Sequence, residues 1–128
     1  MSAISNYLEN KLIDATLRGI SFTAPAKVYL ALFTTDPTDA GTGTEVSGAG
    51  YTRKEITFGA PTDGAAIVSA EIIFPAATAS WGTISHLAVY DADTAGNLLY
   101  YGPIATPKTI NIDDQLKVSA GDITITLK

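Results

Sequence analysis

The segment from Trp81 to Tyr101 contains the residues of this sequence that are most capable of chemistry. It holds the only tryptophan, the only histidine and an Asp-x-Asp pair, Asp91 and Asp93. The pair occupies the first and third positions of a calcium-loop pattern, but the twelfth position, where a bidentate glutamate belongs, is Gly102. Asp, Gly and Asn are also the residues that tight turns favour. The pattern therefore predicts a plain hairpin turn, with a weak cation site as the alternative.

His86 is the one candidate for a histidine base. If the strand around it is regular, its face is shared by Ile84, Ala88 and Tyr90. A histidine base needs a nucleophile and an orienting acid within reach, and the sequence has neither a Gly-x-Ser-x-Gly elbow nor a His-Glu-x-x-His run. We interpret His86 as structural. Trp81 is interpreted as the anchor at the start of a strand, with carbohydrate stacking as its alternative.

Paired carboxylates are the other chemical candidates, at Asp113–Asp114 and at Asp36 with Asp39. Glycosidase carboxylates face each other across a cleft, which neighbouring residues on one turn do not do. The absence of cysteine removes thiolate metal sites, cysteine nucleophiles and disulfides together. We therefore predict solvated turns here, no metal or other cofactor, and no enzymatic activity.

The elements that must position these residues begin with one helix. Apolar residues recur at helical spacing from residue 3 to residue 18. Ser2 is expected to cap the helix, and Gly19 suits the left-handed residue beyond its end. The apolar stripe that must be buried comprises Ile4, Leu8, Leu12 and Ala15.

After Gly19 the pattern predicts short strands separated by Gly, Pro and Asp. The expected strands are Lys27–Thr35, Tyr51–Phe58, Ala65–Phe74, Thr83–Tyr90, Leu98–Ala105, Thr109–Ile112, Leu116–Ser119 and Asp122–Leu127. The strand "VYLALF" is apolar on both faces, which predicts a central strand covered by the helix or by a neighbouring subunit. The fold predicted is mainly β: a single domain over 1–128, with an N-terminal α-helix (1–19) and an antiparallel β-sandwich (20–128), Ig-like or jelly-roll-like.

Composition and charge limit the classes of molecule that this protein can be expected to bind. The 128 residues carry a net charge of −5, and their eight basic residues are scattered, which disfavours nucleic acid as a partner. We expect no membrane insertion or export, because no apolar run approaches about 18 residues and the N-terminus lacks a leader pattern. The expected place of synthesis is therefore a cytoplasm.

The connection from Asp36 to Gly50 is about as long as structureless loops become in compact domains. Such loops are usually functional or disordered. Two interpretations stay open: a plain surface loop, or a loop ordered by a partner or a neighbouring subunit.

Four segments are distinctive: "LENKLIDATLRG", "PAKVYLALFTTDPTDAGTGTEVSGAGYTRKEITFG", "FPAATASWGTISHLAVYDA" and "GNLLYYGPI". In combination they resemble a family of small virion structural proteins of tailed bacteriophages. Family members share the short helix that ends in Leu-Arg-Gly, here Leu17 to Gly19, and the Leu-Phe-Thr-x-x-Pro-Thr-Asp and Gly-Thr-Glu-Val-Ser-Gly segments. The resemblance implies a virion protein made in the bacterial host cytoplasm. Such proteins are commonly described as tail-fibre proteins, and similar small β-rich phage proteins decorate capsids.

Tail fibres usually gain reach through repeats, triple β-helices or coiled coils, none of which is visible in this sequence. We therefore expect a capsid decoration, or cement, protein: a homotrimer that binds the major capsid protein and stabilises the shell. The residues predicted to contact the shell or sister subunits are Ile4, Leu8, Leu12, Asp36, Thr38, Asp39, Thr44, Glu45 and Val46.

The alternative is a receptor-binding tail fibre or adhesin, whose partner would be a host surface glycan or other tail proteins. It would use an exposed groove formed by Trp81, His86, Tyr100 and Tyr101.

Overall fold

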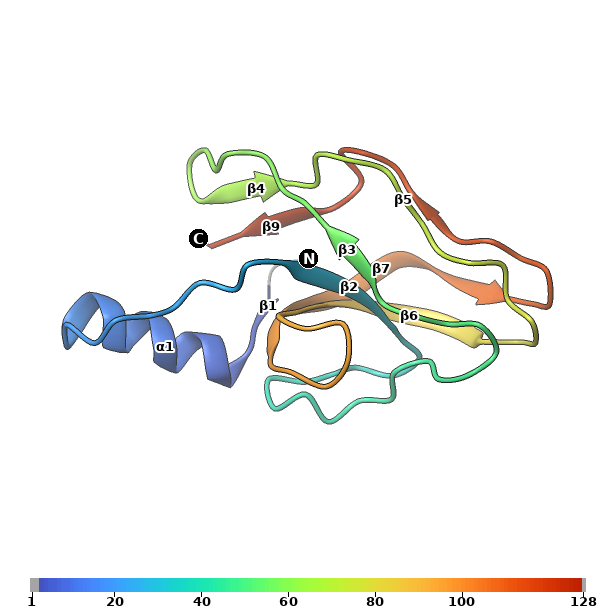
Figure 1. Cartoon of the computed structure of the whole chain (residues 1–128), viewed down its shortest axis with the longest axis horizontal. Helices are drawn as coiled ribbons and strands as arrows, with labels where there is room; N and C mark the ends of the chain where they lie inside the picture. The colour runs from blue at the N-terminus through green and yellow to red at the C-terminus, as the bar shows by residue number, and fades with distance from the viewer. Residues whose placement is uncertain (1–2, 128) are drawn as a thin grey trace.

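The computed structural model describes residues 3–127, in which antiparallel strands predominate and one helix lies near the N-terminus (Figure 1). The elements in chain order are β1 (Ala3–Ile4), α1 (Asn6–Leu17), β2 (Val28–Phe33), β3 (Lys54–Ile56), β4 (Ala65–Ile67), β5 (Ile72–Ile73), β6 (Gly82–Tyr90), β7 (Leu98–Ile110), β8 (Lys117–Val118) and β9 (Thr124–Thr126). The predicted fold class, mainly β with one N-terminal helix, is confirmed.

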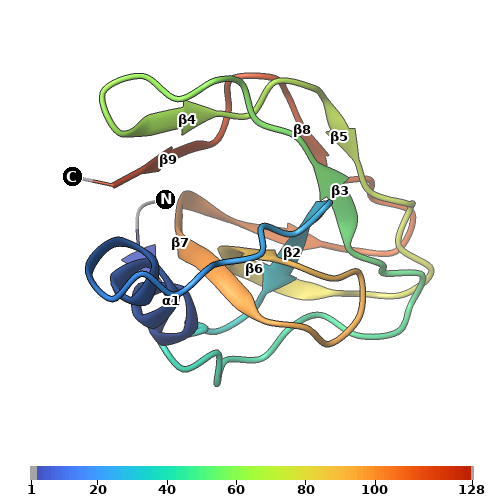
Figure 2. The same ribbon diagram turned by 60° about the vertical axis from the view of Figure 1, so that its left-hand side comes forward.

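The main sheet has the strand order β1-β7-β6-β2-β3. The pairs β4-β9 and β5-β8 form two small sheets that lie over one face of it (Figures 1 and 2). The main core fills the space between these layers, where Leu30, Phe74 and Ile84 have no exposed surface. This arrangement is sandwich-like, because apolar residues of two sheet layers face each other.

Strand β2 is buried on both faces, as its sequence predicts. Leu30 and Leu32 point into the main core, while Ala31 and Phe33 join a second apolar cluster on the opposite face with Tyr90 and others. The expected cover was the helix or another subunit. Residues of the long loop lie against this cluster: Gly41 lies beside Leu98, and the Tyr101 hydroxyl donates to Asp39. Cover by a neighbouring subunit stays a prediction.

Helix α1 begins three residues later than predicted. Ser5 is its N-cap, and the Ser5 hydroxyl accepts a hydrogen bond from the Leu8 amide at 3.2 Å. Residues Ala3 and Ile4 instead form β1, which pairs with Tyr101 and Tyr100 of β7. The predicted cap, Ser2, lies outside the described residues. Gly19 has a φ of +67°, as expected for the residue that follows a helix.

Two strand predictions need correction. The predicted strand over residues 65–74 is divided into β4 and β5, because the Val68 amide donates to Ile123 while the Ser69 amide donates to Thr57. The predicted strands over residues 98–105 and 109–112 are one strand, β7. Residues 104–107 of β7 form a bulge opposite Ser85. Pro107 is tolerated there because a residue in a bulge does not need to donate a backbone hydrogen bond to the neighbouring strand.

Candidate functional site

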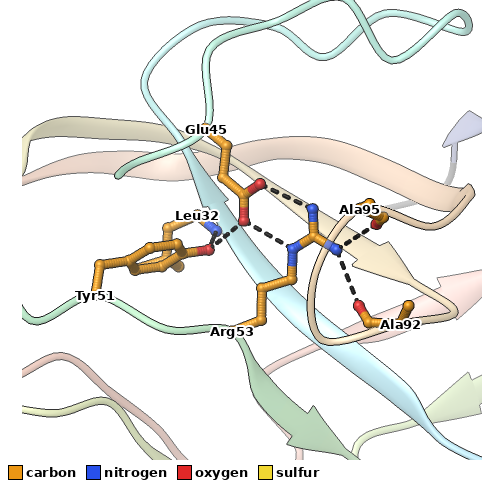
Figure 3. Close-up of polar contacts among 6 residues, drawn as sticks. All are labelled: Leu32, Glu45, Tyr51, Arg53, Ala92 and Ala95. Atoms are coloured by element: carbon orange, nitrogen blue, oxygen red, sulfur yellow. Dashed lines mark hydrogen bonds and ion pairs between the residues drawn. The ribbon is translucent and has the colours of Figure 1, made fainter. Parts of the chain in front are cut away.

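Arg53 joins the long loop and the segment before β3 to the distant β6–β7 turn (Figure 3). Its guanidinium forms a bidentate ion pair with Glu45, with Nε–Oε2 and Nη2–Oε1 distances of 2.8 and 2.9 Å. Its Nη1 also donates to the carbonyl oxygens of Ala92 and Ala95, at 2.9 and 2.7 Å. The guanidinium lies 3.8 Å from the centre of the Tyr90 ring, a cation–π distance. We call Arg53, Glu45 and their partners the Arg53 network.

Tyr51 extends this network into the main sheet. Its hydroxyl donates to Glu45 Oε2 at 2.7 Å and accepts from the Leu32 amide at 3.0 Å. Burial, together with the hydrogen bond to Glu45, raises the pKa of Tyr51 well above the usual tyrosine range. The phenol therefore stays protonated and remains a donor to the carboxylate. The network thus connects the long loop, the segment before β3 and the β6–β7 turn.

The long loop over Asp36–Gly50 is ordered by contacts within the chain. The Val46 amide donates to Leu32 at 3.0 Å, and the Thr34 amide donates to Thr44 at 2.9 Å. Glu45 forms a β-bridge with Phe33. These contacts hold the loop from within the chain, and the interpretation that a partner or a neighbouring subunit also orders it stays a prediction.

The β6–β7 turn is a hydrogen-bonded turn. Both carboxylate oxygens of Asp91 accept from Asn97, from its amide at 2.7 Å and from its side chain at 2.9 Å. In the same turn, the carbonyl oxygens of Ala92 and Ala95 accept hydrogen bonds from the Arg53 guanidinium. No group of three or more His, Asp or Glu residues suited to a metal ion occurs in residues 3–127.

His86 has a hydroxyl group and a carboxylate nearby, but only the hydroxyl group is within hydrogen-bonding distance. Its Nδ1 lies 2.9 Å from the Ser85 hydroxyl, whereas its Nε2 lies 4.0 Å from Asp36 Oδ2, beyond hydrogen-bonding distance. His86 pairs with Phe33 across the sheet. Ile84 lies in the main core and not on the same face as Ala88, because the register shifts between Ile84 and His86.

Trp81 is a core residue, as the anchor interpretation predicts. It is 5% exposed, and its Nε1 donates to the Ala49 carbonyl at 2.9 Å. Its ring meets Tyr51 and Phe74 edge to face, with centroids 5.5 and 6.5 Å apart. Carbohydrate stacking on Trp81 is therefore wrong, because no face of the ring is accessible.

The aromatic groove expected for an adhesin does not form. Tyr100 packs against the main core, whereas Tyr101 packs against the cluster on the opposite face of the sheet and donates its hydroxyl to Asp39. Paired carboxylates lie in turns, as predicted: Asp114 accepts from the Asn111 amide, and Asp36 accepts from the Thr38 amide, both at 2.8 Å.

Some of the predicted interface residues are packed or ion-paired within the chain, and the others lie at its surface. Leu8 and Val46 are 4% and 6% exposed and belong to the core, and Ile4 and Leu12 are half-buried beside it. Glu45 is held in the Arg53 network. The side chains left at the surface are those of Asp36, Thr38, Asp39 and Thr44.

Sequence reasoning missed the Arg53 network. Arg53 is one of eight basic residues scattered along the sequence, and its partners lie 8 to 42 residues away in the chain. The available signal was a single glutamate in a polar loop, followed eight residues later by a single arginine.

These features define a β-rich module whose loops are held by ion pairs and aromatic contacts within the chain. The chain matches the family described as "Podophage GP4 fiber I protein gp80" over residues 3–126, and it belongs to this family. No curated protein matches it. The family confirms the resemblance to tailed-phage structural proteins. It assigns the chain a non-enzymatic structural role and a place in the virion. No helix within residues 3–127 is long and apolar enough to cross a membrane.

Proposed function

We propose that the protein is a fibre subunit of a tailed-phage virion and acts through surface contacts alone. The observation that carries this proposal is the family match, because it covers residues 3–126 and its description names a fibre protein. Because the match covers nearly the whole chain, the proposed fibre role concerns the β module as a whole. The Arg53 network suits this role, since it keeps the loops at one end of the module in a fixed shape.

Helix α1 is the proposed attachment element. It extends beyond the sheets at one end of the molecule (Figure 1) and is anchored there by Leu8. Beyond this anchor, Ile13, Leu17 and Ile20 are 52%, 79% and 45% exposed. Ile13 and Leu17 are four residues apart and are therefore neighbours on the helix surface, and apolar residues exposed side by side are typical of contacts with other proteins. The half-buried Ile4 and Leu12 border the same helix and remain candidates for such contacts.

The loop side chains Asp36, Thr38, Asp39 and Thr44 form a second candidate contact surface. Their backbone is fixed by the chain itself, so binding a partner would not require ordering of the loop. Leu8, Glu45 and Val46 would act indirectly, by maintaining the shape of the helix and the loop.

Capsid decoration is the second candidate function. It is favoured by the absence, within residues 3–127, of any repeat or long helix that would give a fibre its reach. In this role the chain, as a homotrimer, would bind the major capsid protein. It would stabilise the expanded shell by mass action, by roughly RT ln(1 + [L]/Kd) per site.

Electron microscopy of virions that carry a gold-labelled copy of the protein separates the two functions. Label confined to the tail or its fibres is the expected result. Label distributed evenly over the head would overturn the fibre proposal in favour of capsid decoration. An internal control is a labelled major capsid protein, which must decorate the head in the same preparation.

A further inference from the structure

Two adjoining cavities lie at the end of the module that the Arg53 network organises. One has a volume of about 520 Å³ and lies beside Arg53, and the other, of about 370 Å³, lies beside Lys27. Tyr29 and Asp93 line both cavities. These two side chains therefore form a ridge between two depressions, which we call the Tyr29–Asp93 ridge. Each volume is within the range of small-molecule sites.

The walls of the larger cavity are held in place before any ligand binds. Arg53 binds the carbonyl oxygens of Ala92 and Ala95, which flank Asp93 and Thr94. On the opposite wall, the bidentate pair with Glu45 fixes the loop that carries Ser47. A site fixed in this way loses little conformational entropy on binding.

The groups that line this cavity suit a polyhydroxylated ligand. Ser47, Thr52 and Thr94 contribute hydroxyl groups, and Asp93 contributes a carboxylate. Within residues 3–127, none of these four side chains makes a hydrogen bond or an ion pair. Tyr29 is half-buried and adds an aromatic surface next to them. Sugars present hydroxyl groups at their edges and C–H groups on their faces, so they need both kinds of partner.

The charges of the site select against anions. Glu45 is neutralised by Arg53, and Lys27 is paired with Glu55 at 3.3 Å. Asp93, two residues from Asp91, remains as an uncompensated negative charge on the ridge. An anionic sugar or a phosphate would be repelled, whereas a carboxylate accepts strong hydrogen bonds from neutral hydroxyl groups.

We propose that the Tyr29–Asp93 ridge binds a neutral saccharide, with the sugar face against Tyr29 and its hydroxyl groups on Asp93, Thr52 and Thr94. This inference goes beyond the proposed function, because a fibre subunit that served only as a structural link would need no ligand. It requires neither metal nor the aromatic residues Trp81 and Tyr100. A virion subunit with such a site would contact glycans directly.

Amide chemical shifts of the ¹⁵N-labelled protein, followed during titration with sugars, test the proposal. The probes are glucose, galactose and N-acetylglucosamine at millimolar concentrations in buffer with EDTA, and N-acetylneuraminic acid as the anionic comparison. We expect saturable shifts centred on Thr52, Asp93 and Thr94 for at least one neutral sugar, and none for the anionic sugar.

Matched variants locate the site. Tyr29→Phe should retain binding, because no hydrogen bond of its hydroxyl is part of the site, whereas Tyr29→Leu should abolish it. Asp93→Asn should weaken binding about tenfold or more through loss of the charge-assisted acceptor. Asp63→Asn, in an exposed turn outside both cavities, is the control and should bind like the wild type. Unfolding midpoints of all variants verify that each is folded.

The proposal is overturned if no neutral sugar produces saturable shifts, if binding requires Ca²⁺, or if the anionic sugar binds as well as the neutral ones. Binding that survives Tyr29→Leu in a folded protein also overturns it. None of these results alters the location of the protein in the virion, so this inference and the proposed function fail independently.

Discussion

Replacing Arg53 by methionine tests whether the Arg53 network holds the loops together. Methionine retains an unbranched apolar stem beside Tyr90 but removes the ion pair with Glu45 and both bonds to the β6–β7 turn. Breaking a buried ion pair costs about 3–5 kcal/mol, because it leaves one charge uncompensated. The Glu45 side chain is 25% exposed, so water partly solvates it. We therefore expect a loss near the lower limit, about 3 kcal/mol of unfolding free energy.

Urea denaturation of Arg53→Met beside Arg18→Met measures this difference. Arg18 forms an ion pair of similar length with Asp14, at 2.9 Å, but its side chain is 66% exposed. Exposed pairs of this kind contribute less than about 1 kcal/mol, so Arg18→Met is the matched control. Equal unfolding free energies for the two variants would refute the argument that burial gives the Arg53 pair its importance.

A double-variant cycle with Glu45→Gln isolates the pair itself. Since Arg53 and Glu45 contact each other directly, their effects should not add, and we expect a coupling energy of about 2 kcal/mol. Additive effects would mean that the turn carbonyl groups, and not Glu45, account for the stabilisation by Arg53.

Further variants test the helix, the histidine and the tyrosine. Leu8→Asp should lower the free energy of unfolding by about 3 kcal/mol or more, because Leu8 is 4% exposed. Leu17→Asp should lower it by less than about 0.5 kcal/mol, because Leu17 is 79% exposed. Thermal unfolding of the two variants measures this difference. His86→Gln should leave unfolding and virion yield nearly unchanged, and complete loss of function in a folded variant would contradict a structural role. The hydrogen bond to Asp39 raises the pKa of Tyr101 to about 12, from 10.0. The stability that this bond contributes is therefore full below about pH 10 and is lost as the pH rises through about 12. Tyr101→Phe should reduce the alkaline loss of stability, measured by urea unfolding from pH 9 to about 12.

Local patterns in the sequence predict much of the fold. The alternation of β2, the extent of β6 and the turn residues Asp91 and Asn97 are determined by near neighbours in the chain, and the structure agrees with them. The alternation along β6 does not hold through the register shift between Ile84 and His86. The beginning of the helix is different. Ile4 fits the helical period, but it lies in β1 because it pairs with Tyr100 and because Ser5 caps the helix after it. Tyr100 is nearly a hundred residues away in the chain, so this pairing is not visible in the local sequence.

Long-range contacts also explain the remaining errors. The change of partner at Val68 and Ser69 divides a continuous apolar run into two strands, which its composition does not reveal. Proline suggested a break in β7, yet a bulge accommodates Pro107. The Arg53 network is the most important omission, because a single arginine in a sequence does not indicate which carbonyl groups or carboxylate it will meet.

The copy number of the protein in purified virions, measured by quantitative mass spectrometry against the major capsid protein, tests the central claim most directly. A fibre subunit should occur in a small number set by the symmetry of the tail, on the order of 3 to 18 copies. Hundreds of copies would contradict the fibre proposal and support capsid decoration. Absence of the protein from virions whose other structural proteins are all detected would contradict a structural role altogether.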